Sequence, residues 1–421
     1  MLKNKKILSH VLWGGGDQFL RLILGIVVHV TLARLMGVEN FGIYNYCLAI
    51  GGFAVLISRA GFENYMVKEL IAKSDFYTEI LKSGLCYLSI MSLVVFFLAL
   101  IYLYLMESDP NIFSYNIIVL LPVFFSPFFI FDYYFQSAIE GKKSAVARIV
   151  SFYVGSFLKI VVYYSTSSIL ALLFVILFES IIYAGILLWN GRCLIAPIVK
   201  AKYDSKWIKD TAKTTLPLLL TAISMMGCIR LDQLMIKNFL GMESLGIYSA
   251  ASRLFEAWTT IPFIITTVFY PIILNYKKFE NESYFMNMVF LTRTVFYMTI
   301  IAILIFFYFG DEFILFLYGE DFNEVHSVLL MLLISALFVS LGSITTKYLV
   351  AEGMEKRLMY RVAIGLLINF ILNYFLIPFY ELRGAVFSSI VSFFFSYFLY
   401  DYLDRKSIEL RIIKRKAILG V

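Results

Sequence analysis

The sequence contains two similar octets, GVENFGIY at 37–44 and GMESLGIY at 241–248. They match at five of eight positions, and each is a short polar segment between two long apolar runs. Their offset of 204 positions, from 37 to 241, is close to half of the 421-residue chain. A second pair, AIEG at 138–141 and VAEG at 350–353, shares Glu-Gly before a basic turn. A long period of this kind indicates a duplicated unit, so we interpret the chain as two copies of one half.

The composition places both copies in a membrane. Hydrophobic residues make up 61% of the chain, charged residues make up 15%, and the mean hydropathy is +0.83. Soluble domains carry about 25% charged residues, so we predict an integral membrane protein. The net charge of +7 does not indicate a nucleic-acid partner, because the sequence has no zinc spacing, RNP motif or basic soluble helix. Four widely spaced cysteines predict buried thiols rather than disulfides or a metal site, and no motif indicates a cofactor.

The apolar runs predict the fold class. A spanning helix needs about 20 mostly apolar residues, and two sets of about six such runs are present. We predict an all-α membrane protein of about 12 transmembrane helices in two six-helix bundles. An even number of spans in each bundle makes the copies parallel in the membrane. The runs are 9–35, 42–62, 83–105, 113–138, 146–166 and 168–190, then 214–240, 246–274, 288–309, 326–350, 358–379 and 383–403.

The polar segments between the runs predict the domain boundaries and the orientation. Most of the 36 Lys and Arg residues lie at the N-terminus, in alternate loops, in a central linker and in the tail. Positively charged loops stay in the cytoplasm, so we expect both termini to be cytoplasmic and both octets to face outward. The predicted domains are an N-terminal bundle at 1–191, a cytoplasmic linker at 192–213, a C-terminal bundle at 214–404 and a basic cytoplasmic tail at 405–421.

Several charged residues fall inside the predicted spans of the first half. A charge at a helix centre costs about 2.5–3.5 kcal/mol, so it faces protein or water, or its long side chain reaches the membrane interface. Asp17 and Arg21 are i, i+4 neighbours on a polar face of the first helix. Either this pair joins the helix to a neighbour, or the face lines a hydrated cavity. Arg59 lies near a helix end. Either its side chain reaches the membrane interface, or it faces protein or water.

The second half carries the strongest signal on a single helix. Ser249, Arg253, Glu256 and Thr260 follow one face at helical spacing. A polar stripe of this length with two opposite charges should not face lipid. Arg230, on the preceding helix, lies with Gln233 and Lys237 on one side, and Asp232 lies on the other.

Two further charges, Lys159 and Glu179, fall near mid-depth of the fifth and sixth helices. The sequence leaves open whether they meet. Basic residues outnumber acidic residues within the spans, so the interior of the protein should favour the binding of an anion. Arginine suits phosphate because its planar guanidinium forms paired, charge-assisted hydrogen bonds. No phosphate-binding loop, Gly-rich fingerprint or His/Glu metal cluster is present, so transport is favoured over catalysis.

The duplicated spans, the segment ARLMGVENFGIY at 33–44 and the basic residues on helices one, two, seven and eight resemble a Wzx-type polysaccharide flippase. Such flippases belong to the superfamily of multidrug, oligosaccharidyl-lipid and polysaccharide exporters. The resemblance covers essentially the whole chain, although the second copy has Asn238 and Leu245 where the first has Arg34 and Phe41.

The resemblance implies a V-shaped pair of bundles around a central cavity in the bacterial inner membrane. It also implies transfer of polyprenyl-pyrophosphate-linked oligosaccharide, such as O-antigen units, from the cytoplasmic to the periplasmic leaflet. Membrane lipids and other polysaccharide assembly proteins are the further partners expected. On this interpretation the substrate-binding residues are Arg21, Arg59, Arg230, Arg253 and Lys159, and the charge-balancing or ion-coupling residues are Asp17, Asp232, Glu256 and Glu179.

Proton or sodium antiport is a further hypothesis, motivated by the acids within the spans. The main alternative function is a cation-coupled multidrug exporter of the same superfamily, which predicts an acid-dominated cavity. A membrane glycosyltransferase or polymerase would carry a large outer loop, and the longest candidate, at about 310–325, is short. A major-facilitator protein is disfavoured because the loop after the second helix lacks the G-x-x-x-D-R-x-G-R-R pattern.

Overall fold

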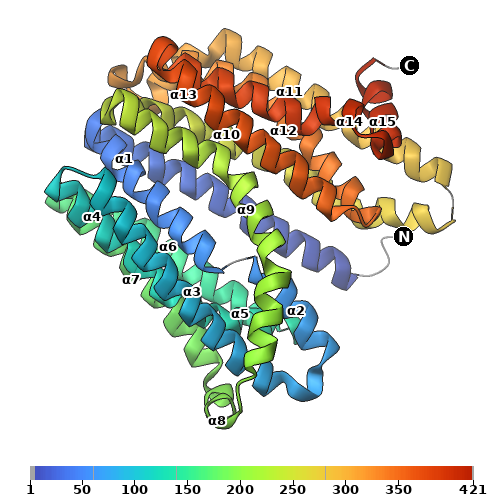
Figure 1. The fold of residues 1–421 in the computed structure, drawn as a ribbon. Helices are drawn as coiled ribbons and strands as arrows, with labels where there is room; N and C mark the ends of the chain where they lie inside the picture. The colour runs from blue at the N-terminus through green and yellow to red at the C-terminus, as the bar shows by residue number, and fades with distance from the viewer. Residues whose placement is uncertain (1–4, 60, 139, 280, 420–421) are drawn as a thin grey trace. The chain divides into compact units, whose positions relative to one another are not determined.

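The computed structural model describes residues 5–59, 61–138, 140–279 and 281–419, and every regular element in these ranges is helical (Figure 1). Over these ranges the predicted apolar runs are mostly helical. The α-helices are α1 Lys5–Arg59, α2 Phe62–Ala72, α3 Tyr77–Met106, α4 Pro110–Leu120, α5 Phe129–Ser137, α6 Gly141–Thr166, α7 Ile169–Asn190, α8 Arg192–Lys200, α9 Ser205–Leu240, α10 Met242–Phe279, α11 Asn281–Tyr318, α12 Glu324–Ala351, α13 Glu355–Phe394, α14 Tyr400–Leu403 and α15 Ile408–Leu419.

Two long helices, α1 and α13, each contain one predicted span and much of the next, and bend between them. The backbone of α1 leaves the helical conformation at Gly37, with φ 72° and ψ 171°, and that of α13 does so at Glu381, with φ 53°. Glycine accepts a positive φ because it has no Cβ. The break in α1 therefore lies at Gly37, the first residue of the first octet. Over the described residues, eight helical segments are long and apolar enough to span a membrane. The protein is therefore a multi-pass membrane protein, and the number twelve stays a prediction.

The predicted span at 113–138 is not one continuous α-helix. A 3₁₀ segment, Leu121–Phe128, separates α4 from α5. It contains Pro122 and Pro127. Proline removes a backbone donor and clashes with the preceding turn, which explains the change in helix type.

The chain divides into two compact units, one formed by Met1–Gly42 with Ser224–Val421 and the other by Ile43–Ile223. We call them unit 1 and unit 2. These limits differ from the predicted bundles, because the first part of α1 packs with the C-terminal half. The bundle boundaries stay a prediction, since helices that pack together in one conformation need not move together.

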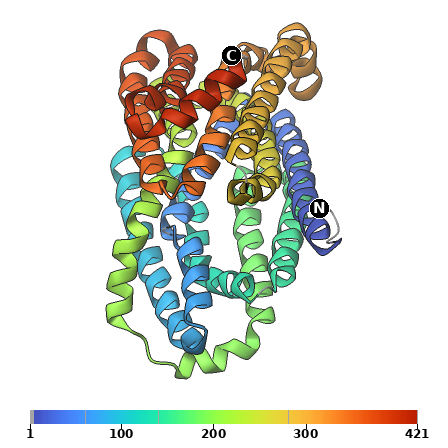
Figure 2. The same cartoon turned by 90° about the vertical axis from the view of Figure 1, so that its right-hand side faces the viewer.

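Unit 2 has its core around Phe62, which is fully buried. The Phe62 ring stacks on Tyr87 at 5.1 Å between centroids and contacts Trp207 edge-on at 6.2 Å. These residues come from α2, α3 and α9, so aromatic packing joins three helices. The long helices α6 and α7 run side by side, and the short α8 joins the end of α7 to the start of α9 (Figures 1 and 2).

Unit 1 is built around α12. This helix packs against α10, α11 and α13, and 72% of its most apolar window is buried, against 11% for α11. Its interior positions include Ser335, Ala336, Ser340 and Gly342, and small residues let helix backbones approach closely in membranes. In this arrangement α12 is the central helix and α11 is a peripheral one (Figure 1).

The two octets contact each other within unit 1. A Cβ added to Gly42 would lie 1.9 Å from the carbonyl oxygen of Met242, and one added to Gly246 would lie 2.1 Å from that of Val38. Val38 corresponds to Met242 and Gly42 corresponds to Gly246 in the repeat. The contact is therefore reciprocal, as expected for two parallel copies related by a local two-fold axis.

Lys414, which lies in the predicted cytoplasmic tail, is buried together with Arg361 and Asp401. Arg361, Asp401 and Lys414 are exposed by 0%, 1% and 2%. Asp401 accepts from Arg361 Nη1 at 2.9 Å and from Lys414 Nζ at 2.5 Å. The triad joins α13, α14 and α15, so the basic tail is a packed helix. The cysteine prediction was partly wrong, because Cys47 and Cys228 are buried but Cys193 is exposed.

Candidate functional site

The polar faces of α9 and α10 meet in unit 1. Arg230 Nη1 donates to Gln233 Oε1 at 3.0 Å, and Gln233 Nε2 donates to Ser249 Oγ at 3.2 Å. Glu256 lies between the two arginines, with one carboxylate oxygen 3.6 Å from Arg230 and the other 3.5 Å from Arg253. The structure thus brings together three predicted site residues, Arg230, Arg253 and Glu256, which we call the arginine cluster.

The arginine cluster carries two guanidinium groups and one carboxylate. Side-chain exposures are 27% for Arg230, 38% for Arg253 and 28% for Glu256, so all three are accessible. The two ion-pair distances exceed the roughly 2.7–2.9 Å of a tight charge-assisted hydrogen bond. The Glu256 carboxylate therefore makes only long ion pairs with the two guanidinium groups.

The first helix contributes His29 to the same neighbourhood. Arg253, Arg230 and Ser249 lie near His29, and its ring packs edge-on against Phe41 at 4.6 Å between centroids. Its Nε2 is buried without a hydrogen-bond partner among the described residues. Arg21 is half-buried on α1, whereas the side chain of Asp17 lies outside the described residues, so the predicted Asp17–Arg21 pair stays a prediction.

Asp232 lies on the other side of α9 and is fully buried. Its carboxylate accepts hydrogen bonds from Tyr248 at 2.6 Å, Ser389 at 2.6 Å, Asn373 at 2.6 Å and Asn369 at 3.1 Å. These donors, in the described part of the chain, are all uncharged. Among the described contacts the two arginines pair with Glu256, and Asp232 is a separate buried carboxyl group held by neutral donors.

The remaining predicted residues belong to unit 2. Arg59 lies with its guanidinium carbon 3.5 Å from the centroid of the Phe129 ring, a cation–π contact. Lys159 and Glu179 do meet, with Nζ and Oε2 2.6 Å apart and side-chain exposures of 16% and 22%. Gly155 makes room for this pair, since an added Cβ would lie 2.5 Å from Glu179 Oε2. The charge of Lys159 is therefore balanced within unit 2.

Sequence reasoning missed most partners of the buried acids. Asn369 and Asn373, which bind Asp232, are an i, i+4 amide pair in an apolar run, and that spacing was a usable signal. Arg148, near the start of the predicted span at 146–166, pairs with the buried Asp132 at 3.0 Å, and Tyr183 donates to the same carboxylate at 2.8 Å. No local pattern links these three residues, because they come from three helices.

The whole chain resembles solved transporters in fold. The "Lipid II flippase MurJ, inward closed conformation" gives a TM-score of 0.74 at 16% identity over 96% of this chain and 90% of that one. An inward-facing MATE family multidrug resistance transporter of the MOP superfamily gives 0.67 at 12% identity over 95% of each chain. The eukaryotic MATE transporter AtDTX14 gives 0.63 at 12% identity over 98% and 99%. The protein thus shares the fold of these solved transporters.

Sequence comparison then identifies the family. A family model described as "Polysaccharide biosynthesis protein" matches residues 7–277, and the chain belongs to this family. The capsular polysaccharide biosynthesis protein CapF of Staphylococcus aureus is 23% identical over 405 residues, 92% of this chain and 97% of that protein. The resemblance to polysaccharide exporters inferred from the sequence is therefore confirmed.

Proposed function

We propose that this protein is a non-enzymatic flippase that moves polyprenyl-pyrophosphate-linked oligosaccharides, such as O-antigen or related repeat units, from the cytoplasmic to the periplasmic leaflet of the bacterial inner membrane. The arginine cluster is the observation that carries the proposal. Two accessible guanidinium groups share one loosely held carboxylate inside a membrane protein of a polysaccharide family. Guanidinium groups match the oxygens of a diphosphate in geometry and in charge.

The proposed mechanism starts with exchange of anions at the arginine cluster. In the empty state Glu256 balances Arg230 and Arg253. When the lipid-linked sugar enters, its diphosphate takes the place of the carboxylate. The two bundles then expose the site to the other side by alternating access. An inside-negative potential favours this direction by about 2.3 kcal/mol per charge per 100 mV, so export of a diphosphate gains energy from the potential itself.

Ion antiport is the second part of the proposal. Asp232 is the buried acid best placed for it, because its neutral donors leave its charge uncompensated by any cation among its described contacts. A proton or a sodium ion taken up there would neutralise the carboxylate. Flipping in proteoliposomes should then depend on an imposed proton or sodium gradient, and flipping that ignores both gradients would reject antiport.

The main experiment measures transfer of a fluorescent polyprenyl-diphosphate sugar across proteoliposomes. Arg230→Gln and Arg253→Gln should each lower the rate by about tenfold or more, because a charge-assisted bond to phosphate is lost. Arg192→Gln is the matched control, since Arg192 is exposed on α8 and contacts only the Trp189 ring among its described interactions. Equal rates for the wild type and both cluster variants would refute the proposal.

The multidrug exporter remains the alternative, and the same variants separate the two. Drug cations should be attracted by acids and repelled by a site with two guanidinium groups to one carboxylate. Neutralising Arg253 should therefore improve drug export if that function is the real one, and should impair lipid flipping if our proposal is right.

A further inference from the structure

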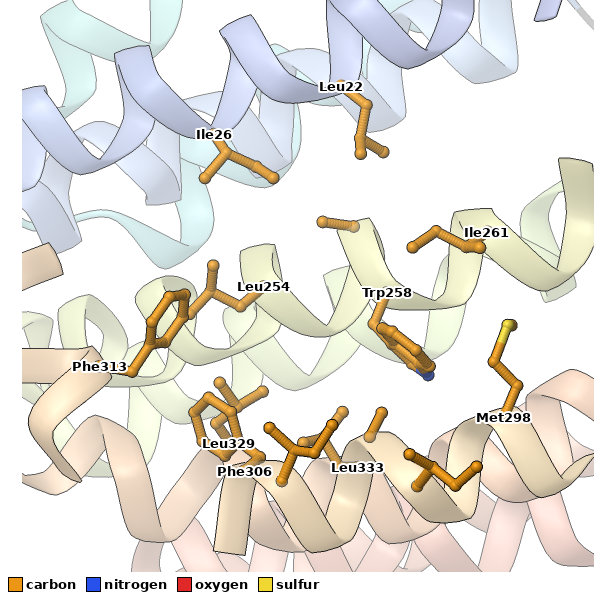
Figure 3. Close-up of a pocket in the computed structure, with 14 residues that line it drawn as sticks. Leu22, Ile26, Leu254, Trp258, Ile261, Met298, Phe306, Phe313, Leu329 and Leu333 are labelled. Atoms are coloured by element: carbon orange, nitrogen blue, oxygen red, sulfur yellow. The ribbon is translucent and has the colours of Figure 1, made fainter. Parts of the chain in front are cut away.

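Unit 1 contains an apolar cavity of about 420 Å³ beside the arginine cluster. Its walls come from α1, α10, α11 and α12 (Figure 3). Leu22 and Ile26 point from α1 toward α10, whereas Trp258 of α10 points the other way, toward Met298 of α11 (Figure 3). Further side chains of α11 and α12 complete the wall. The volume is within the range of about 300–1,000 Å³ that is usual for small-molecule sites.

The lining excludes a polar ligand. All fourteen residues that line the cavity are Leu, Ile, Ala, Met, Phe or Trp. A sugar or a phosphate placed here would lose its hydrogen bonds to water without replacement, which costs several kcal/mol for each polar group. Apolar cavities also tend to exclude water. The chemistry of the wall therefore selects a hydrocarbon chain.

The cavity and the arginine cluster occupy adjacent faces of the same helix. On α10, Arg253 and Glu256 belong to the cluster, whereas Leu254 and Ala257, each the next residue, line the cavity. Successive helical residues point about 100° apart, so the two faces meet along an edge of α10. One ligand with an anionic head and a hydrocarbon chain can thus contact both.

We propose that the cavity binds the first isoprene units of the polyprenyl chain while the arginine cluster binds the diphosphate. This inference rests on the proposed function and adds a site for the lipid part of the substrate. A single cavity suits the one chain of a polyprenyl diphosphate better than the paired chains of a phospholipid. The two guanidinium groups beside it also match a diphosphate better than the single phosphate of a phospholipid.

The test measures binding of two probes to the purified full-length protein in detergent. Inorganic pyrophosphate reports the head site alone, and farnesyl diphosphate reports the head and chain together. Wild-type protein should bind farnesyl diphosphate about tenfold or more tightly than pyrophosphate, because each buried methylene adds affinity. Farnesyl diphosphate, but not pyrophosphate, should change the fluorescence of Trp258, and the change should vanish in Trp258→Phe.

Two variants that fill the cavity sharpen the test. Ala302→Phe on α11 and Ala257→Leu on α10 should each remove the advantage of the prenyl chain and leave pyrophosphate affinity unchanged. The control is Leu304→Phe, because Leu304 is 53% exposed on α11 and does not line the cavity. This control should behave like wild type with both probes. Using two variants on different helices protects the test if one of them misfolds.

The possible failures are distinguishable. If both filling variants keep the chain advantage while pyrophosphate still binds, the cavity inference is wrong and the proposed function stands. If a brominated phosphatidylcholine quenches Trp258 and farnesyl diphosphate does not displace it, the cavity is a phospholipid site and the inference is also wrong. If neither pyrophosphate nor farnesyl diphosphate binds the wild type, the proposed function itself fails.

Discussion

Replacing Gly246 by alanine tests the contact between the two octets. The added Cβ would lie 2.1 Å from the carbonyl oxygen of Val38, 3.0 Å from its carbonyl carbon and 3.1 Å from its Cγ1. Carbon–oxygen contacts in proteins lie at about 3.3–3.6 Å, so the two segments must separate by more than an ångström at this point. The obstructing atoms are mostly backbone, which cannot rotate away.

The cost follows from overpacking. Inserting one methyl group into a packed interior costs about 1–3 kcal/mol, and a backbone obstruction places this site at the upper end. Alanine has the higher helix propensity, which returns at most about 1 kcal/mol. We therefore expect Gly246→Ala to destabilise the protein by about 2 kcal/mol. Gly42→Ala should cost a similar amount because the contact is reciprocal.

The assay is thermal unfolding in detergent, followed by loss of the monodisperse peak in size-exclusion chromatography. Gly52→Ala is the matched control, since Gly52 lies in α1 as Gly42 does, and an added Cβ at Gly52 has nothing within 4 Å. It should be neutral or stabilising. If Gly246→Ala and Gly42→Ala melt at or above the temperature of Gly52→Ala, the two octets are not in contact and the reasoning is refuted.

Four further predictions concern charged groups. Asp401→Asn should destabilise the protein by about 3–5 kcal/mol because it leaves two buried cations unpaired. Lys414→Met should cost much less, because Arg361 still pairs with Asp401. Comparable melting temperatures for the two variants would contradict this difference. Burial lowers the pKa of Lys414 below its ordinary 10.5, against the opposing effect of Asp401. The unfolded chain therefore binds that proton more tightly, and the contribution of Lys414 to stability should rise as the pH increases toward 10.5. Lys414→Met should abolish this rise in thermal melts recorded across that pH range. Glu256→Gln should release both arginines and raise the affinity of the protein for inorganic pyrophosphate. The increase should be at most about fivefold, since partly exposed ion pairs are weak. Weaker binding of pyrophosphate in calorimetry would argue against the exchange of anions. Lys159→Met should destabilise the protein by leaving the Glu179 charge uncompensated in an apolar region. The double variant Lys159→Met/Glu179→Leu should recover most of the lost stability. A double variant as unstable as the single one would show that loss of the ion pair does not cause the destabilisation.

Helical periodicity explains which site residues were predictable. Arg253 and Glu256 share a face of one helix, so their spacing alone places them together. Arg230 could be assigned to a polar face of the neighbouring helix in the same way. The octets could be recognised as equivalent because their residues match and because each lies between two long apolar runs. These features depend on local geometry, which the order of residues determines.

The sequence by itself determined the membrane environment, the helical segments, the duplication and the polar stripes on single helices, because hydropathy and periodicity are properties of neighbouring residues. Only the tertiary structure decided that Lys159 meets Glu179, that Asp232 is held by amides and hydroxyls, and that Arg361 and Lys414 are buried on Asp401. The apolar cavity beside the arginine cluster also needed the structure. Each of these depends on the rotation and depth of one helix against another, and many packings bury the same apolar faces about equally well.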